Sequence, residues 1–181
     1  LSALRQQDYP RLEILVLDDD SSDRTAEIAA DFAARDARIR LLKGAPLPSG
    51  WHGKAFACHQ LAQEARGEWL LFVDADVRPA PNAVSASLRA ALREEGDLLT
   101  YLPYLPTGTF WEKVLMPLVA FFPFFLLPMK QITEGRNPLF CMAFGPFMLF
   151  RASTYRTIGG HEAVRQQITE DMALAVSYTH L

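Results

Sequence analysis

The segment Trp69–Asp76 constrains the fold of this chain most, because five apolar residues run directly into two aspartates separated by one alanine. An apolar run of this length, with Gly67 before it and Pro79 after it, predicts a strand buried on both faces. Asp74 and Asp76 at its carboxyl end would be costly to desolvate unless a cation balanced their charge. The hard oxygens of an Asp-x-Asp pair suit Mg²⁺ or Mn²⁺, so we expect a metal here that also contacts a substrate phosphate.

The amino-acid composition limits the classes of protein to which this chain can belong. The 181 residues are enough for one α/β domain with a substantial core, and we expect a single domain over 1–181. A net charge of -3 argues against a nucleic-acid partner. Half of the residues are hydrophobic, yet the mean hydropathy is +0.03, which excludes a polytopic membrane protein. Cys58 and Cys141 show no metal-ligand spacing and predict reduced thiols in the cytosol.

The first residues give a further expectation about the extent of the domain. Residues 1–12 are polar and mixed, which is not the pattern of a signal peptide. Residues 1–7 look like the last turns of a helix, so we expect a truncated domain that lacks its first strand.

Apolar runs alternate with helical patterns along the first 102 residues. The predicted strands are 12–17, 39–43, 69–73 and 97–102, and the predicted helices are 25–35, one from Lys54 onward and one after Pro81. This order predicts a mostly parallel, doubly wound sheet flanked by helices, whose ligands bind at the carboxyl ends of the strands. The pairs Asp18-Asp19 and Asp74/Asp76 both lie at that edge, so we expect one shared site.

Several of these charged residues also have ordinary structural explanations. Asp20 and Asp23 could simply cap the following helix and keep the turn soluble. Lys54 stands at a helix start, where its charge opposes the helix dipole, so it either points to solvent or meets an anion such as a diphosphate. Glu170 and Asp171 open a final helix, where acids are common for the same reason.

The segment Val114–Met129 is uncharged over sixteen residues and contains three prolines. It is shorter than the roughly 20 residues that span a bilayer, and its prolines should break a straight helix. A buried core element is one interpretation. We favour an apolar segment at the membrane interface, about 110–130. Its polar anchors would be Trp111, Lys113, Lys130 and Arg136.

Three motifs together resemble family 2 glycosyltransferases with the GT-A fold. The turn 15–25 is similar to that family's Val-Asp-Asp-Gly-Ser-x-Asp-x-Thr turn, with Asp20 where glycine is usual. Asp74-Ala75-Asp76 matches the Asp-x-Asp metal motif, and Thr169-Glu170-Asp171 matches the segment that supplies the catalytic base.

The resemblance implies a role for each of these residues. The donor would be a nucleotide-diphosphate sugar with its nucleoside near Asp18 and Asp19. Asp76, assisted by Asp74, would hold Mg²⁺ or Mn²⁺ on the diphosphate, and Lys54 would add positive charge. Asp171 would be the base in an inverting displacement, with Glu170 supporting the site without touching the substrate.

The Gly50–Lys54 segment and the Pro-rich apolar stretch look most like membrane-associated bacterial members of the family. This resemblance implies a lipid or lipid-linked acceptor with a hydroxyl or carboxyl group, and a location on the cytoplasmic face of a membrane. Two alternatives remain open at this point. One is a receiver-type signalling domain with Asp74 as phosphoacceptor, against which Asp76 argues. The other is a non-catalytic sugar-nucleotide-binding protein.

Overall fold

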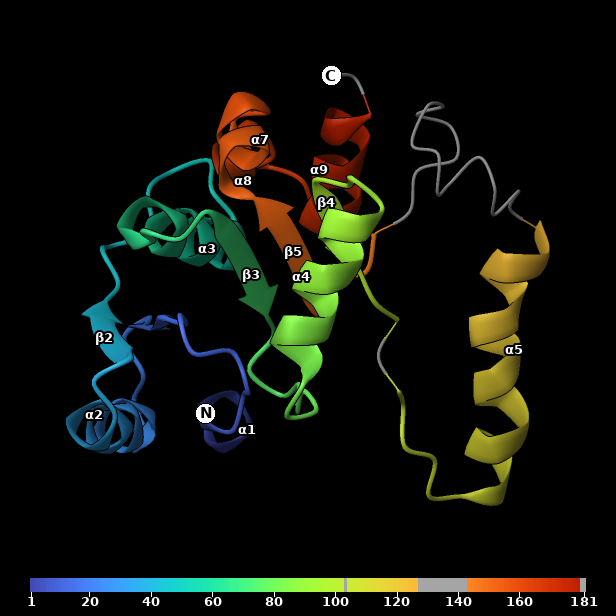
Figure 1. Ribbon diagram of the computed structural model, residues 1–181, viewed down its shortest axis with the longest axis horizontal. Coiled ribbons are helices and arrows are strands. Elements are labelled where there is room, and N and C mark those ends of the chain that lie inside the picture. Colours follow the sequence, from blue (N-terminus) through green and yellow to red (C-terminus); the bar gives the residue numbers. More distant parts are fainter. Residues whose placement is uncertain (103, 127–142, 180–181) are drawn as a thin grey trace.

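The computed structural model describes residues 1–102, 104–126 and 143–179 (Figure 1). The strands are β1 (Ile14–Asp18), β2 (Ile39–Lys43), β3 (Trp69–Val73), β4 (Leu98–Thr100) and β5 (Phe147–Arg151). The helices are α1 (Ser2–Arg5), α2 (Thr25–Arg35), α3 (Gly53–Glu64), α4 (Ala83–Arg93), α5 (Phe110–Leu126), α7 (Ala152–Thr157), α8 (Gly160–Ala163) and α9 (Glu170–Tyr178). The predicted alternation of strands and helices up to β4 is confirmed.

The strands form two sheets, and the α/β class with flanking helices is confirmed. β1 pairs in parallel with β2, and the second sheet has the order β3-β5-β4. β5 is antiparallel to both of its neighbours. β5 lies between β3 and β4, so both pairings in this sheet are antiparallel, and the parallel pairing among the described strands is that of β1 with β2.

Helices cover both faces of the β3-β5-β4 sheet. Side chains alternate between the two faces of a strand, so Leu70, Met148 and Phe150 pack on the side of α7 and α9. Leu71 and Leu149 pack on the other side, against α4. Burial on both faces explains why the sequence of β5 is a continuous apolar run.

A cleft of about 400 Å³ lies between the two sheets, and no strand pairing among the described residues joins β1 to β3. Ile14 and Leu15 of β1 line one side, and β3 lines the other. Leu70 is therefore the single fully buried residue of β3, and the other four are partly exposed. The expectation of a strand buried on both faces was wrong for β3, because it borders this cleft; β5 has that position instead.

Helix α5 corrects the expectation that the prolines would break the apolar segment. Residues 110–126 form one helix of 17 residues despite Pro117 and Pro123. Each proline removes one main-chain hydrogen bond, and the remaining bonds preserve the helix. Figure 1 shows α5 standing apart from both sheets. Phe121 and Phe125 are 59% and 74% exposed, which excludes a buried core element for this part.

Part of the apolar segment lies outside the described residues, as do the expected anchors Lys130 and Arg136 and also Cys141. Among the helices that the structure describes, none combines the length and the apolar character needed to cross a bilayer. Glu170 and Asp171 open helix α9, as expected, and this helix continues to Tyr178.

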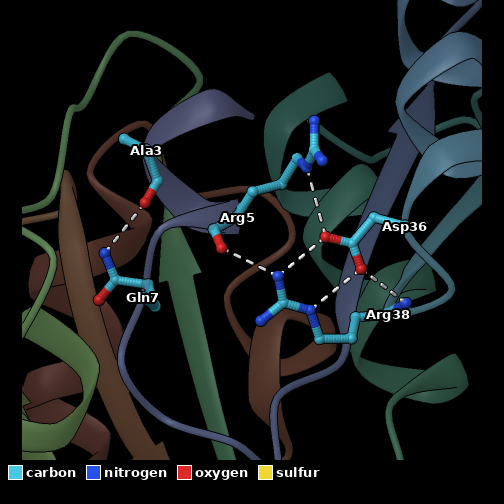
Figure 2. A network of polar contacts seen from close by, with 5 residues as sticks. All are labelled: Ala3, Arg5, Gln7, Asp36 and Arg38. Carbon is cyan, nitrogen blue, oxygen red and sulfur yellow. Dashed lines mark hydrogen bonds and ion pairs between the residues drawn. The ribbon is translucent and has the colours of Figure 1, made fainter.

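An ion-pair network fixes the N-terminal helix to the turn between α2 and β2 (Figure 2). Asp36 accepts hydrogen bonds from Arg38 at 2.8 Å and from Arg5 at 3.3 Å. Arg38 also donates to the main-chain oxygen of Arg5 at 2.9 Å, and Gln7 donates to that of Ala3 at 3.1 Å. The hydrogen bonds from Arg38 hold the pKa of Asp36 well below its usual range, so this carboxylate stays charged.

Candidate active site

The Asp-x-Asp pair follows β3 directly, as predicted. The main-chain N–H of Asp74 donates to Pro146 O at 3.2 Å, and Val77 N–H donates to Asp74 O at 3.1 Å, which forms a tight turn after the strand. The side chain of Asp74 is one-third exposed, and Asp76 is exposed. Both carboxylates therefore remain accessible to a ligand.

Lys54 does not point freely to solvent; its ammonium group joins two carboxylates from different parts of the chain. Its Nζ lies 3.1 Å from Oδ1 of Asp74 and 3.0 Å from Oε1 of Glu170. Burial lowers the pKa of Lys54, but the hydrogen bonds and charges of Glu170 and Asp74 outweigh it and raise the pKa. Lys54 therefore stays protonated, and α3, β3 and α9 are connected through one charge.

Asp171 lies in the same cleft and is held by main-chain donors. Its Oδ2 accepts from Gly145 N–H at 2.9 Å, and its Oδ1 accepts from Met172 N–H at 2.8 Å. A Cβ atom at position 145 would lie 3.0 Å from that same Oδ2. Gly145 therefore permits the close approach of Asp171, and the sequence pattern alone did not identify this residue.

We expect Gly145→Ala to displace the Asp171 carboxylate and to lower the rate of any reaction that uses it by about tenfold or more, since small misplacements of a catalytic group are costly. Nucleotide binding should change little. The matched control is Gly96→Ala, where the added Cβ meets only one atom, at 3.9 Å. Equal rates for the wild type and Gly145→Ala would contradict this role.

The acidic turn after β1 is the least connected part of the predicted site. Asp18 and Asp19 are absent from the described lining of the two cavities near Asp74. Asp20 has φ +59°, a left-handed conformation that aspartate tolerates better than most residues, which explains how it replaces the family's usual glycine. Asp23 accepts from Thr25 N–H at 2.9 Å and so stabilises the start of α2, but the N-cap position itself is occupied by Arg24.

Asp74 borders two cavities. The cleft between the sheets is lined near Asp74 by Lys54, Gly145, Glu170 and Asp171. The second cavity, of about 720 Å³, is lined by both Asp74 and Asp76. The structure therefore brings four of the predicted site residues to one cleft and places Asp76 next to it.

Two lining residues of the cleft, Cys58 and His161, were not predicted from the sequence to lie at the site. Burial raises the pKa of the Cys58 thiol to about 11, so it remains a protonated, unreactive thiol. His161 is buried, and its Nδ1 lies 2.7 Å from the hydroxyl of Tyr155. That hydroxyl accepts His161 N–H at 3.0 Å, so its own proton is directed to Nδ1. The glycine-rich sequence around His161 contains no pattern that predicts a buried histidine. The burial of His161 follows only from the packing of α8 on α3.

The oxygen donors of the acidic pair have the chemistry that suits a divalent ion. Within residues 1–102, 104–126 and 143–179, no group of three or more His, Cys, Asp or Glu side chains is arranged to hold a metal. Two carboxylates leave the remaining coordination positions to water and phosphate oxygens, which is the usual way in which proteins hold Mg²⁺. Asp74 and Asp76 supply this donor set.

The family model described as "Glycosyl transferase family 2" matches residues 1–159, which include β1, the acidic turn and the Asp-x-Asp pair. The chain belongs to glycosyl transferase family 2. This assignment confirms the resemblance seen in the motifs and removes the receiver-domain interpretation.

The family 2 chain has curated relatives and structural neighbours. A 4,4'-diaponeurosporenoate glycosyltransferase from Staphylococcus aureus (strain bovine RF122 / ET3-1) is 32% identical over 186 residues, which is 99% of this chain and 46% of the relative. The same enzyme from strain USA300 is 31% identical over the same shares. This family 2 chain therefore spans about half the length of the curated relatives that it matches.

Solved structures confirm the GT-A-type fold. The mannosyltransferase PcManGT from Pyrobaculum calidifontis, in complex with GDP-Man and Mn²⁺, has a TM-score of 0.62 at 19% identity, covering 88% of this chain and 41% of that one. Staphylococcus aureus TarS 1-349, in complex with UDP, has a TM-score of 0.60 at 18% identity, covering 96% and 48%.

Proposed function

We propose that this chain is part of an inverting, metal-dependent glycosyltransferase that moves a sugar from a nucleotide diphosphate to an apolar, lipid-like acceptor. The observation that supports it most is the meeting of Lys54, Asp74, Glu170 and Asp171 in one cleft, from three elements. One structural neighbour is in complex with the sugar nucleotide GDP-Man and Mn²⁺, and another is in complex with UDP, the nucleotide part of such a donor.

In the proposed reaction, an acceptor oxygen attacks the anomeric carbon from the face opposite the diphosphate. The bond from that carbon to the diphosphate oxygen breaks, and its electron pair leaves with the nucleotide. Asp171 takes the proton when the acceptor is a hydroxyl group. A Mg²⁺ or Mn²⁺ on Asp74 and Asp76 would offset the charge that develops on the leaving group.

Lys54 would contribute a second positive charge toward the diphosphate. Glu170 is 12% exposed and holds the lysine ammonium in the cleft. Asp74 competes for the same ammonium, so a cation bound at Asp74 would leave Lys54 available to the phosphate oxygens. Asp18 and Asp19 would contact the nucleoside, although they lie beyond the lining of both cavities.

A lipid-like acceptor is supported by two independent features. The relatives are named for 4,4'-diaponeurosporenoate, an apolar acceptor. Helix α5 exposes Phe110, Trp111, Leu118, Phe121 and Phe125 on one extended apolar surface, which fits contact with a membrane interface.

Nucleotide binding tests the proposed function directly. UDP and GDP should bind with affinities at least tenfold higher in the presence of Mn²⁺, and Asp76→Ala should remove most of this gain because half of the carboxylate pair is lost. Isothermal titration of both proteins, with and without Mn²⁺, measures it. Glu95→Ala, which removes a carboxylate just beyond the end of α4, serves as the control. If neither Mn²⁺ nor the substitution changes the affinity for the nucleotides, the proposed donor site is ruled out.

Sedimentation with liposomes tests the membrane contact. We expect vesicles of phosphatidylcholine and phosphatidylglycerol to carry the protein into the pellet, and Phe121→Glu with Phe125→Glu to reduce the bound fraction severalfold. Both side chains are exposed, so the changes should not unfold the protein. A protein that stays in the supernatant with and without vesicles would overturn this assignment of α5.

A further inference from the structure

The second cavity has the chemistry of a site for an amphipathic molecule. It measures about 720 Å³, within the roughly 300–1,000 Å³ of pockets that hold drug-sized ligands. Its charged residues, Asp74, Asp76 and Arg78, follow directly on β3 and lie within five consecutive residues. The remaining described wall is almost entirely apolar or aromatic, including Tyr101, Leu105 and Phe147.

The apolar wall offers little polarity that would compete with a ligand. Tyr101 N–H donates to Phe147 O at 3.4 Å, and the two rings pack with their centroids 5.4 Å apart. Ser87 also lines the cavity, but its hydroxyl donates to Ala83 O at 2.6 Å and is already satisfied. A ligand body that enters here therefore meets carbon surface.

Arg78 is available at the charged end. It is exposed and forms no ion pair or hydrogen bond with any residue that the structure describes. An arginine guanidinium carries five donors and suits an oxygen-bearing ligand group. The neighbouring aspartates make a free anion a poor ligand by themselves, whereas an apolar molecule can bring a single oxygen-bearing end to this position.

The cavity also has the right neighbours for an acceptor. Pro146 lines it, and the adjacent Gly145 holds the carboxylate of Asp171. Along the chain, the cavity residues Tyr104 and Leu105 come shortly before α5, whose first residues Phe110 and Trp111 are 70% and 67% exposed.

We propose that this second cavity binds the acceptor, an elongated apolar molecule whose hydroxyl or carboxylate end lies against Arg78. The inference rests on the proposed transferase function and adds the place and class of its acceptor. The acceptor oxygen forms the new bond to the anomeric carbon, and the diphosphate leaves with the electron pair of the broken bond. A hydroxyl passes its proton to Asp171, and a carboxylate has none to pass.

Retinol and retinoic acid are suitable probes, because they share an apolar body and end in a hydroxyl and a carboxyl group respectively. We expect retinol to bind the wild-type protein, as measured by its fluorescence, and Ala86→Trp to weaken binding at least tenfold by filling the cavity. Tyr104→Glu should weaken it severalfold. Because Tyr104 is 88% exposed, this second variant does not depend on repacking the core. Arg89→Gln, an exposed change on the same helix, should have no effect.

The two probes also distinguish the two acceptor ends. Tighter binding of retinoic acid, with the preference lost in Arg78→Gln, assigns a carboxylate end, and equal binding assigns a hydroxyl end. No retinol binding, or equal affinity for the wild type and both cavity variants, overturns the assignment; equal affinity would place the probe on the surface of α5. Mn²⁺-dependent binding of UDP or GDP, measured on the same samples, shows separately whether the proposed function holds.

Discussion

Replacing Asp171 by Asn is expected to lower the rate of sugar transfer to a hydroxyl acceptor by about 10³-fold, the contribution typical of a positioned general base. Asparagine has the same shape and can still accept one of the two main-chain hydrogen bonds that hold Asp171. It cannot take a proton. The fold and the affinity for UDP or GDP should therefore be retained while the rate falls.

The measurement is the initial rate of nucleotide release with whichever UDP- or GDP-sugar the wild type turns over. Glu162→Gln serves as a control, since it removes an exposed carboxylate from the neighbouring helix α8. A loss smaller than tenfold for Asp171→Asn with a hydroxyl acceptor would show that the base is another group.

The stability of the protein is expected to fall as the pH drops from 6.5 toward 4, partly because of His161. Burial, with smaller contributions from the charges of Lys54 and His59, lowers the pKa of His161 to about 4. In the unfolded chain a histidine titrates near 6.5. Its stabilising contribution is therefore complete above about pH 6.5 and is lost as protons bind to the unfolded state. By linkage, the loss can reach about 3 kcal/mol.

Comparison with His161→Phe isolates this effect from the other titrating groups. The variant loses the hydrogen bond to Tyr155, so it should be less stable than the wild type at pH 8. The difference should shrink as the pH falls to 4.5, because phenylalanine has nothing to protonate. Urea unfolding at several pH values measures it, with the exposed His52→Gln as control. A difference that stays constant across this range would mean that His161 is not the titrating group.

Local patterns predicted the elements well, because each depends on residues adjacent in sequence. The expected limits 25–35 and 39–43 are those of α2 and β2. The insertion of β5 between β3 and β4 depends on pairing across about 50 to 80 residues, which no local pattern encodes. Gly145 was not predicted for the same reason, because its role depends on its contact with Asp171, which is distant in the sequence.

Only part of the candidate site was predicted, because the rest depends on contacts between residues that are distant in the sequence. Lys54 was expected to meet an anion or solvent, but two carboxylates from distant elements compete for it. Glu170 was expected to support the site, and its ion pair with Lys54 is an interaction of this kind. The cavity beside Asp76 was not predicted, because its wall combines residues of α4 and β5 with loop residues that are distant from them in the sequence.

The separation of the two sheets has a consequence for how a donor would act on the protein. Asp18 ends β1 and Asp19 follows it, whereas Asp74 and Asp171 belong to the other half of the fold, across the cleft. A sugar nucleotide long enough to contact both would connect two halves that share no strand pairing within the described residues. Binding of the sugar nucleotide should therefore reduce local opening in both halves of the protein. The rate of main-chain amide hydrogen exchange should then fall in β1 and β3 together.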